Sequence, residues 1–286
     1  MVRADIIIFP TINLRAKKLP LMKFISISLL ASLCTFASPS IFCAAEIAPA
    51  DAEWISLFNG KDLDGWTVKI ARHPLGVNFA GTFRVEEGII KVSYEGYDSF
   101  DEQFGHLYTN LPYSHYILRL EYRFTGEVMP DAPAWTALNS GVMVHAQSPL
   151  SLGLEQSWPA SLEGQFLAAG TKAGRQTGNA CTPGTNLELN GELTTAHIID
   201  SSSKLFPPGE WVTLEIEVHG HDEIIHRVNG VEVLRYQHPQ LDPRDRDAQR
   251  LLAAGASLEL SSGHIALQAE GQPVWFRNVK LLPLDH

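Results

Sequence analysis

Apolar and polar residues alternate along short segments from Trp54 onward, and Gly, Pro and Asn separate these segments. The segment His115–Phe124 shows this most clearly. Its apolar positions are Tyr116, Leu118, Leu120, Tyr122 and Phe124, and the polar positions between them are Arg119, Glu121 and Arg123. Successive side chains of a strand point to opposite faces, so this pattern predicts a strand with one buried and one solvated face.

The C-terminal third repeats this pattern and ends on further strand-like segments. Residues 211–219 alternate in the same way, and Asn229-Gly230 separates two apolar runs. Asn-Gly favours the type I′ turn of a hairpin because both residues tolerate positive φ. Residues 242–254 are charged and then rich in Ala and Leu, which predicts a short helix or an irregular excursion on the surface. No long helical period occurs, so the chain is predicted to be an all-β sandwich or barrel.

The first 45 residues have the pattern of a secretory signal peptide. Lys17, Lys18 and Lys23 precede an apolar run over residues 24–36, and the small-residue site 43–45 follows. We expect translation to start at Met22, residues 46–53 to form a linker and residues 54–286 to form a single domain. The product is then periplasmic or extracellular. The apolar run is too short to cross a bilayer, so we predict that the chain is not integral to the membrane.

The cysteine content limits the possible disulfides, and the net charge limits the classes of binding partner. Removal of residues 1–45 leaves Cys181 as the remaining cysteine, which excludes an intrachain disulfide. Cys43 is an alternative lipidation site, although the bulky Phe42 before it disfavours this. The formal charge of -10 would repel a phosphate backbone, which argues against nucleic acid and is compatible with a neutral carbohydrate.

The absence of several catalytic motifs of known spacing excludes the enzyme classes that depend on them. The sequence has no G-x-S-x-G, Walker, H-E-x-x-H or C-x-x-C motif. Glycosidases use two carboxylates, and the nearest approach on one strand is Glu163-Gly164-Gln165, where an amide replaces the second acid. An ordinary two-carboxylate glycosidase is therefore disfavoured.

The same segment is nevertheless the best candidate site. Period-2 geometry places Glu163 and Gln165 on one strand face, and in residues 141–147 it places Met143, His145 and Gln147 on one face. We expect Glu163, Gln165 and His145 to meet on a concave surface; the alternative is a solvated outer face with ordinary polar side chains. Trp135 and Trp158, each beside a proline, are candidate platforms for a sugar ring.

Five segments in order resemble the 3-keto-disaccharide hydrolase family. They are Leu57-Phe58-Asn59-Gly60-Lys61-Asp62-Leu63-Asp64-Gly65-Trp66, Asn139-Ser140-Gly141-Val142, Glu163-Gly164-Gln165, Asn229-Gly230, and Leu267-Gln268-Ala269-Glu270-Gly271 with Phe276-Arg277-Asn278. Phe104-Gly105-His106-Leu107, Thr182-Pro183-Gly184-Thr185 and His197 resemble a histidine-rich branch of that family. The resemblance implies a concanavalin A-like jelly-roll sandwich of two antiparallel sheets.

The resemblance also implies cleavage of sugars already oxidised at C3, which needs one base and a donor for the enolate rather than an acid pair. Glu163 or His145 would be the base, and Gln165 or a neighbouring histidine the donor. His106, His197, Asn139, Trp135 and Trp158 would bind substrate. No cofactor is certain; the histidines could hold a divalent metal, although no compact ligand spacing shows one.

Two other functions remain open. The same fold serves lectins as readily as enzymes, so the first alternative is a non-catalytic carbohydrate-binding module. The second is an accessory domain that docks another protein. A binder needs aromatic and amide groups but no base, so turnover of an oxidised sugar would separate the enzyme from both alternatives.

Overall fold

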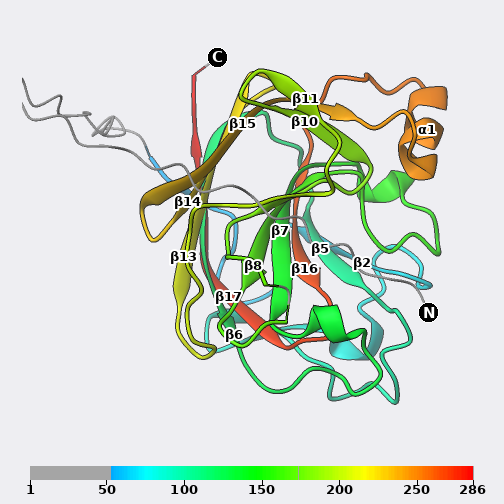
Figure 1. The fold of residues 1–286 in the computed structure, drawn as a ribbon. Helices are drawn as coiled ribbons and strands as arrows, with labels where there is room; N and C mark the ends of the chain where they lie inside the picture. The colour runs from blue at the N-terminus through cyan, green and yellow to red at the C-terminus, as the bar shows by residue number, and fades with distance from the viewer. Residues whose placement is uncertain (1–52, 173, 286) are drawn as a thin grey trace, which may run out of the picture. The chain divides into compact units, whose positions relative to one another are not determined.

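Two antiparallel sheets face each other in the part of the chain that the computed structural model describes, residues 53–172 and 174–285 (Figure 1). The first sheet has ten strands, and β1 (Ile55–Ser56) pairs with β17 beside the main path. The order of the other strands is β11 (Glu192–Thr194), β10 (Thr185–Leu189), β15 (Val231–Leu241), β14 (Glu223–Val228), β13 (Val212–His219), β6 (His115–Phe124), β17 (Val274–Pro283), β4 (Ile89–Val92), β3 (Phe83–Glu86).

The second sheet has seven strands and carries the candidate site. Its order is β12 (Ile198–Ile199), β9 (Ala180–Cys181), β8 (Leu162–Leu167), β7 (Asn139–Ala146), β16 (His264–Ala269), β5 (Gly105–Thr109), β2 (Trp66–Ile70). Neighbours in this order come from distant parts of the chain: β16 lies between β7 and β5. The fold is therefore all-β, as the alternating pattern predicted, and it is the concanavalin A-like jelly-roll sandwich that the family resemblance implied.

The predicted alternation of buried and more exposed positions is present in β6 and β13. In β6 the five apolar positions are buried and the intervening residues are more exposed. The hairpin between β14 and β15 has positive φ at both Asn229 and Gly230, as a type I′ turn requires. These local patterns are confirmed.

The core fills the space between the two sheets. Leu162 and Phe166 of β8 point inward, and the Phe166 ring stacks on Tyr122 of the other sheet with ring centroids 4.1 Å apart. Gly164 lies between them on the same face, and a Cβ there would lie 2.7 Å from Cδ1 of Ile216. The two sheets thus approach closely at Gly164, and Glu163 and Gln165 are left on the opposite, outer face of β8.

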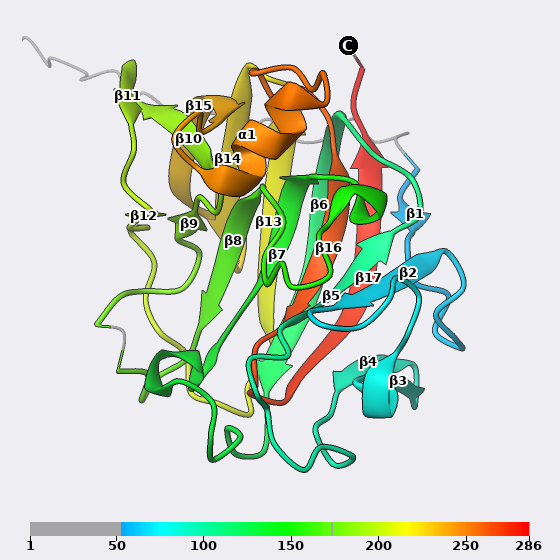
Figure 2. The same cartoon turned by 90° about the vertical axis from the view of Figure 1, so that its right-hand side faces the viewer.

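A short helix, α1 (Arg246–Ala253), lies near the ends of β7 and β8 (Figure 2). It begins at Asp245, whose carboxylate accepts hydrogen bonds from the backbone N–H groups of Asp247 and Ala248. Ala248 packs in a small apolar cluster with Ala160 and Leu241. The helix predicted over 242–254 is thus present. Three 3-10 turns also occur among the described residues: η1 (Phe79–Gly81), η2 (Ala134–Thr136) and η3 (Pro149–Ser151).

Two sequence predictions concern the start of the chain and the membrane. The signal peptide, the start at Met22 and the lipidation site at Cys43 lie outside the described residues. Among the described residues, no helix is long and apolar enough to cross a bilayer.

Candidate active site

A cavity of about 640 Å³ lies on the outer face of the seven-stranded sheet. Small-molecule sites in proteins commonly have volumes of roughly 300–1,000 Å³. Six of the residues singled out from the sequence line it: Trp135, Asn139, Trp158, Glu163, Gln165 and His197. The structure therefore brings together most of the predicted site, from segments as far apart as η2 and the residues before β12.

Glu163 lies across the neighbouring strand β7. Its side chain is 6% exposed, and it passes over Gly141, where a Cβ would lie 2.3 Å from Oε1 and 2.8 Å from Cδ of Glu163. Only a residue without a side chain at position 141 leaves the space that the carboxyl occupies. Gly141 is therefore part of the site because the absence of a side chain there leaves room for the Glu163 carboxyl.

Glu270, directly after β16, is a second buried carboxyl in the cavity, which the search along one strand missed. Its Oε1 accepts hydrogen bonds from the indole Nε1–H of Trp158 and the Nε2 group of Gln268, both at 3.1 Å. Its Oε2 is buried and has no hydrogen-bond partner among the described residues. With Oε1 occupied as an acceptor, a proton on this acid belongs on Oε2.

Burial and charge set the protonation of the two acids. Burial and the charge of Glu270 raise the pKa of Glu163 well above its usual range, while the Arg175 cation and the Cys181 thiol act in the opposite direction. Burial raises the pKa of Glu270 to about 8, although the Trp158 hydrogen bond opposes this. The pair therefore retains at least one proton at neutral pH. The Arg175 cation favours the ionised form of Glu163, and the Trp158 hydrogen bond favours the ionised form of Glu270.

Arg175 and Cys181 belong to the site although the sequence reasoning did not include them. Both line the cavity, and the Nε of Arg175 is buried without a hydrogen-bond partner among the described residues. Cys181 of β9 is the direct cross-strand neighbour of Glu163. Nothing in the spacing of these residues predicts the arrangement, because it depends on which strand lies beside β8.

Gln165 holds a chain of amide hydrogen bonds rather than presenting a free donor. Its Nε2 donates to Oδ1 of Asn139 (3.0 Å), and its Oε1 accepts from Nδ2 of Asn179 (3.0 Å). Both amide atoms of Gln165 are thus engaged within the protein. Asn139, at one end of this chain of amides, also lines the cavity.

The placement of His145 on the same face as Glu163 is wrong. Between the paired residues Ala146 and Met143, β7 has one residue more than β16, which is a β-bulge. His145 takes a φ of 49° there and turns inward, where its Nε2 lies 2.8 Å from the carbonyl oxygen of Gly220, in the turn between β13 and β14 of the other sheet. Strict alternation fails at the bulge, and His145 does not line the cavity.

His106 also does not reach the cavity, although it lies on the outer face of the same sheet. It is 1% exposed, beside Tyr108 on β5. Burial and the charge of Lys69 lower its pKa to about 3, so it is neutral at ordinary pH. The Nζ of Lys69 donates to the backbone oxygen of Leu154, which holds the loop between β7 and β8 against this region. His106 is therefore a buried residue beside the site and is not positioned to bind substrate in the cavity.

Aromatic side chains form one wall of the cavity. The rings of Trp135 and Phe104 are nearly parallel at 5.8 Å, and Trp158 lies 4.5 Å from Phe104 and 6.1 Å from Trp135 between ring centroids. Trp135 remains 46% exposed. An exposed indole supported from behind is a suitable surface for the apolar face of a sugar ring.

The described residues include no group of three or more His, Cys, Asp and Glu side chains that could hold a metal ion. His197, at the rim, is the one of the three predicted site histidines that lines the cavity. The divalent metal considered from the sequence therefore has no ligand set in this part of the chain.

The cavity on the outer face of the jelly-roll sheet thus combines two buried carboxyls, amides and an exposed tryptophan, groups that suit a carbohydrate ligand. The comparison with protein families agrees. The model of the 3-keto-alpha-glucoside-1,2-lyase-like domain matches residues 53–282. The chain belongs to this family.

Similarity to several solved structures is distant. No curated protein matches the chain. A "putative glycosyl hydrolase" from Parabacteroides distasonis is 20% identical over 81% of this chain and 94% of its own, with a TM-score of 0.48. The β-glucanase of Bacillus licheniformis is 12% identical (83% and 100% covered, TM-score 0.44), and a carbohydrate binding module of Bacillus subtilis is 10% identical (75% and 93%, 0.41).

Proposed function

We propose that this protein cleaves the glycosidic bond of 3-keto-glycosides by elimination followed by hydration. The observation that carries the proposal is the pair of buried carboxyls in one cavity, with a cation beside Glu163 and an unpartnered Oε2 on Glu270. One ionised and one protonated carboxyl supply a general base and a general acid at the same pH.

The reaction divides between the two acids. Glu163 takes the proton from C2, which the neighbouring C3 ketone acidifies, and the electron pair forms an enolate. The enolate then collapses to a C1=C2 double bond conjugated with the ketone while the C1–O bond breaks, and Glu270 gives its proton to the leaving oxygen. Water finally adds to C1 as C2 regains a proton. The Arg175 guanidinium stabilises the enolate oxygen, because a preformed cation in a buried site acts where negative charge develops.

Substitution of Glu163 by Gln tests the base. This change keeps the size and most hydrogen bonding of the side chain but removes its basicity, so turnover of a 3-keto-glucoside should fall by roughly 10²–10⁴-fold. His145→Gln is the matched control, since His145 faces the other sheet, and it should leave turnover within a few fold of the wild type. Near-wild-type turnover in Glu163→Gln would refute the assignment.

The alternatives give different outcomes in the same assay. A non-catalytic binding module would bind the oxidised sugar without forming product. The aromatic wall of the cavity would be enough for such binding, because binding needs no base. An ordinary two-carboxylate glycosidase, which the sequence disfavoured for lack of a second acid, is reopened by Glu270. Such an enzyme would cleave the unoxidised glucoside as well as the 3-keto-glucoside, whereas the proposed enzyme cleaves only the latter.

A further inference from the structure

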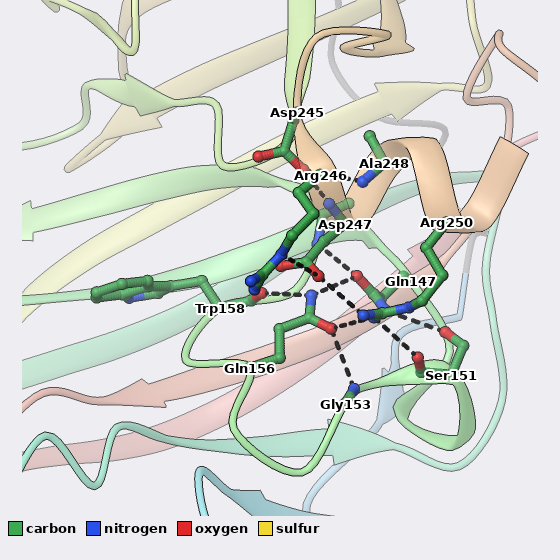
Figure 3. Close-up of polar contacts among 11 residues, drawn as sticks. Gln147, Ser151, Gly153, Gln156, Trp158, Asp245, Arg246, Asp247, Ala248 and Arg250 are labelled. Carbon is green, nitrogen blue, oxygen red and sulfur yellow. Dashed lines mark hydrogen bonds and ion pairs between the residues drawn. The ribbon is translucent and has the colours of Figure 1, made fainter.

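Helix α1 and the loop between β7 and β8 are joined by a cluster of hydrogen bonds (Figure 3). Arg250 of α1 donates to Oε1 of Gln156 (2.7 Å) and, through its other terminal nitrogen, to Asp247 (2.9 Å). The Nε2 group of Gln156 donates to the backbone oxygen of Trp158 (2.8 Å) and to Oε1 of Gln147 (2.9 Å). Gln156 is 6% exposed, so the hydrogen bonds that its Nε2 group donates are shielded from water, whereas the bond between Arg250 and Asp247 is exposed.

The hydrogen bonds of this cluster lead through Trp158 to Glu270 in the cavity. The indole of Trp158, the residue whose backbone Gln156 holds, donates to Oε1 of Glu270. A continuous series of contacts thus runs from Arg250 through Gln156 and Trp158 to Glu270. Arg250 itself does not line the cavity.

We propose that Arg250 and Gln156 are positioning residues that hold the Trp158 indole on Glu270. Helix α1 lies on the surface, and through Arg250 it would then help to position a side chain of the cavity. The catalytic consequence rests on the proposed function, but the contact with Glu270 does not. The guanidinium fork is suited to this task because its geometry is fixed and it bonds Gln156 and Asp247 at the same time.

Loss of the indole hydrogen bond should raise the pKa of Glu270. A hydrogen bond to the ionised carboxylate favours the ionised form, so its removal raises the pKa of Glu270 further. The titratable groups that act with Glu270 are Glu163 of β8, Cys181 of β9 and Tyr94, and none of them contacts Arg250. A change in the titration of Glu270 after substitution of Arg250 therefore reports on Trp158.

Nuclear magnetic resonance of the indole N–H groups tests the inference without substrate. The Trp158 resonance is assigned by its loss in Trp158→Phe and should titrate in the wild type with the ionisation of Glu270. In Arg250→Ala it should move towards the position of a free indole, and the titration midpoint should rise by about one pH unit. Arg250→Lys keeps the charge but not the fork and should show the same change more weakly.

Gln249→Ala is the matched control on the same helix, because the Gln249 side chain donates to the backbone oxygen of Pro243 and takes no part in the cluster. It should leave the resonance and its titration unchanged. An unchanged Trp158 resonance in folded Arg250→Ala would overturn the proposal; if that variant does not fold, the same result in Arg250→Lys would do so.

Turnover gives a second, separate measurement. Both Arg250 variants should lower kcat on a 3-keto-glucoside more than they change KM, because substrate contacts remain while the acid is misplaced. Failure of the wild type to turn over any oxidised sugar would count against the proposed function and would leave the indole titration, and the positioning role, untouched.

Discussion

Gly141 and Gly164 offer a paired test of how the site depends on the faces of neighbouring strands. They lie on β7 and β8, on opposite faces of the same sheet. In Gly141→Ala the new Cβ would lie 2.3 Å from Oε1 of Glu163, whereas non-bonded carbon contacts are favourable only at about 3.5 Å or more. The carboxyl must therefore move by more than about 1 Å.

A displacement of about 1 Å at the reacting group commonly costs about 10²-fold in rate. We expect Gly141→Ala to lower turnover of a 3-keto-glucoside by at least that factor, with a stability loss of about 1–3 kcal/mol from overpacking. In Gly164→Ala the added methyl would lie 2.7 Å from Ile216 and 3.1 Å from Leu214, in the core. This control should lose similar stability while its turnover per folded molecule stays within a few fold.

Initial rates measured well below the thermal midpoint, with thermal unfolding of both variants in parallel, separate the two effects. Equal turnover losses in the two variants after correction for the folded fraction would contradict the argument, because they would show a general response to overpacking. Wild-type turnover in Gly141→Ala would show that the position of the Glu163 carboxyl does not matter to the reaction.

Other predictions concern stability and reactivity. Burial lowers the pKa of His226 from 6.5 to about 4, so the unfolded chain binds this proton first as the pH falls, and the folded state should lose up to about 3 kcal/mol between pH 6.5 and 4. His226→Gln should flatten the thermal midpoint across this window, and an unchanged slope would contradict the assignment. Burial also raises the pKa of the Cys181 thiol; peptide mass spectrometry should find it alkylated by iodoacetamide far more slowly in native than in urea-unfolded protein, and equal rates would count against its burial. Phe166→Ala removes the ring stacked on Tyr122 and should cost about 3–5 kcal/mol in urea unfolding, which a loss below 1 kcal/mol would refute.

Local patterns in the sequence determine the strands, the turn at Asn229-Gly230 and the short helix after residue 242. Strand parity also places Glu163 and Gln165 correctly on one face, because alternation is a property of the extended backbone itself. The same alternation in β16 sets Gln268 opposite Leu267, and it would place Glu270, directly after the strand, on the same face as Gln268. The second acid could therefore have been found by searching for carboxyls on several strands instead of one.

Tertiary structure decides what these local patterns cannot express. His145 turns inward at a bulge that exists only because β7 pairs with β16, which is more than a hundred residues away in the chain. Arg175 and Cys181 meet Glu163 because β9 is the neighbour of β8. Burial raises the pKa of both carboxyls, and the charge of Glu270 raises that of Glu163 further. A sequence pattern reports the direction of a side chain from its own backbone, whereas its neighbours, solvent access and charge state follow from the order of strands in the folded sheet.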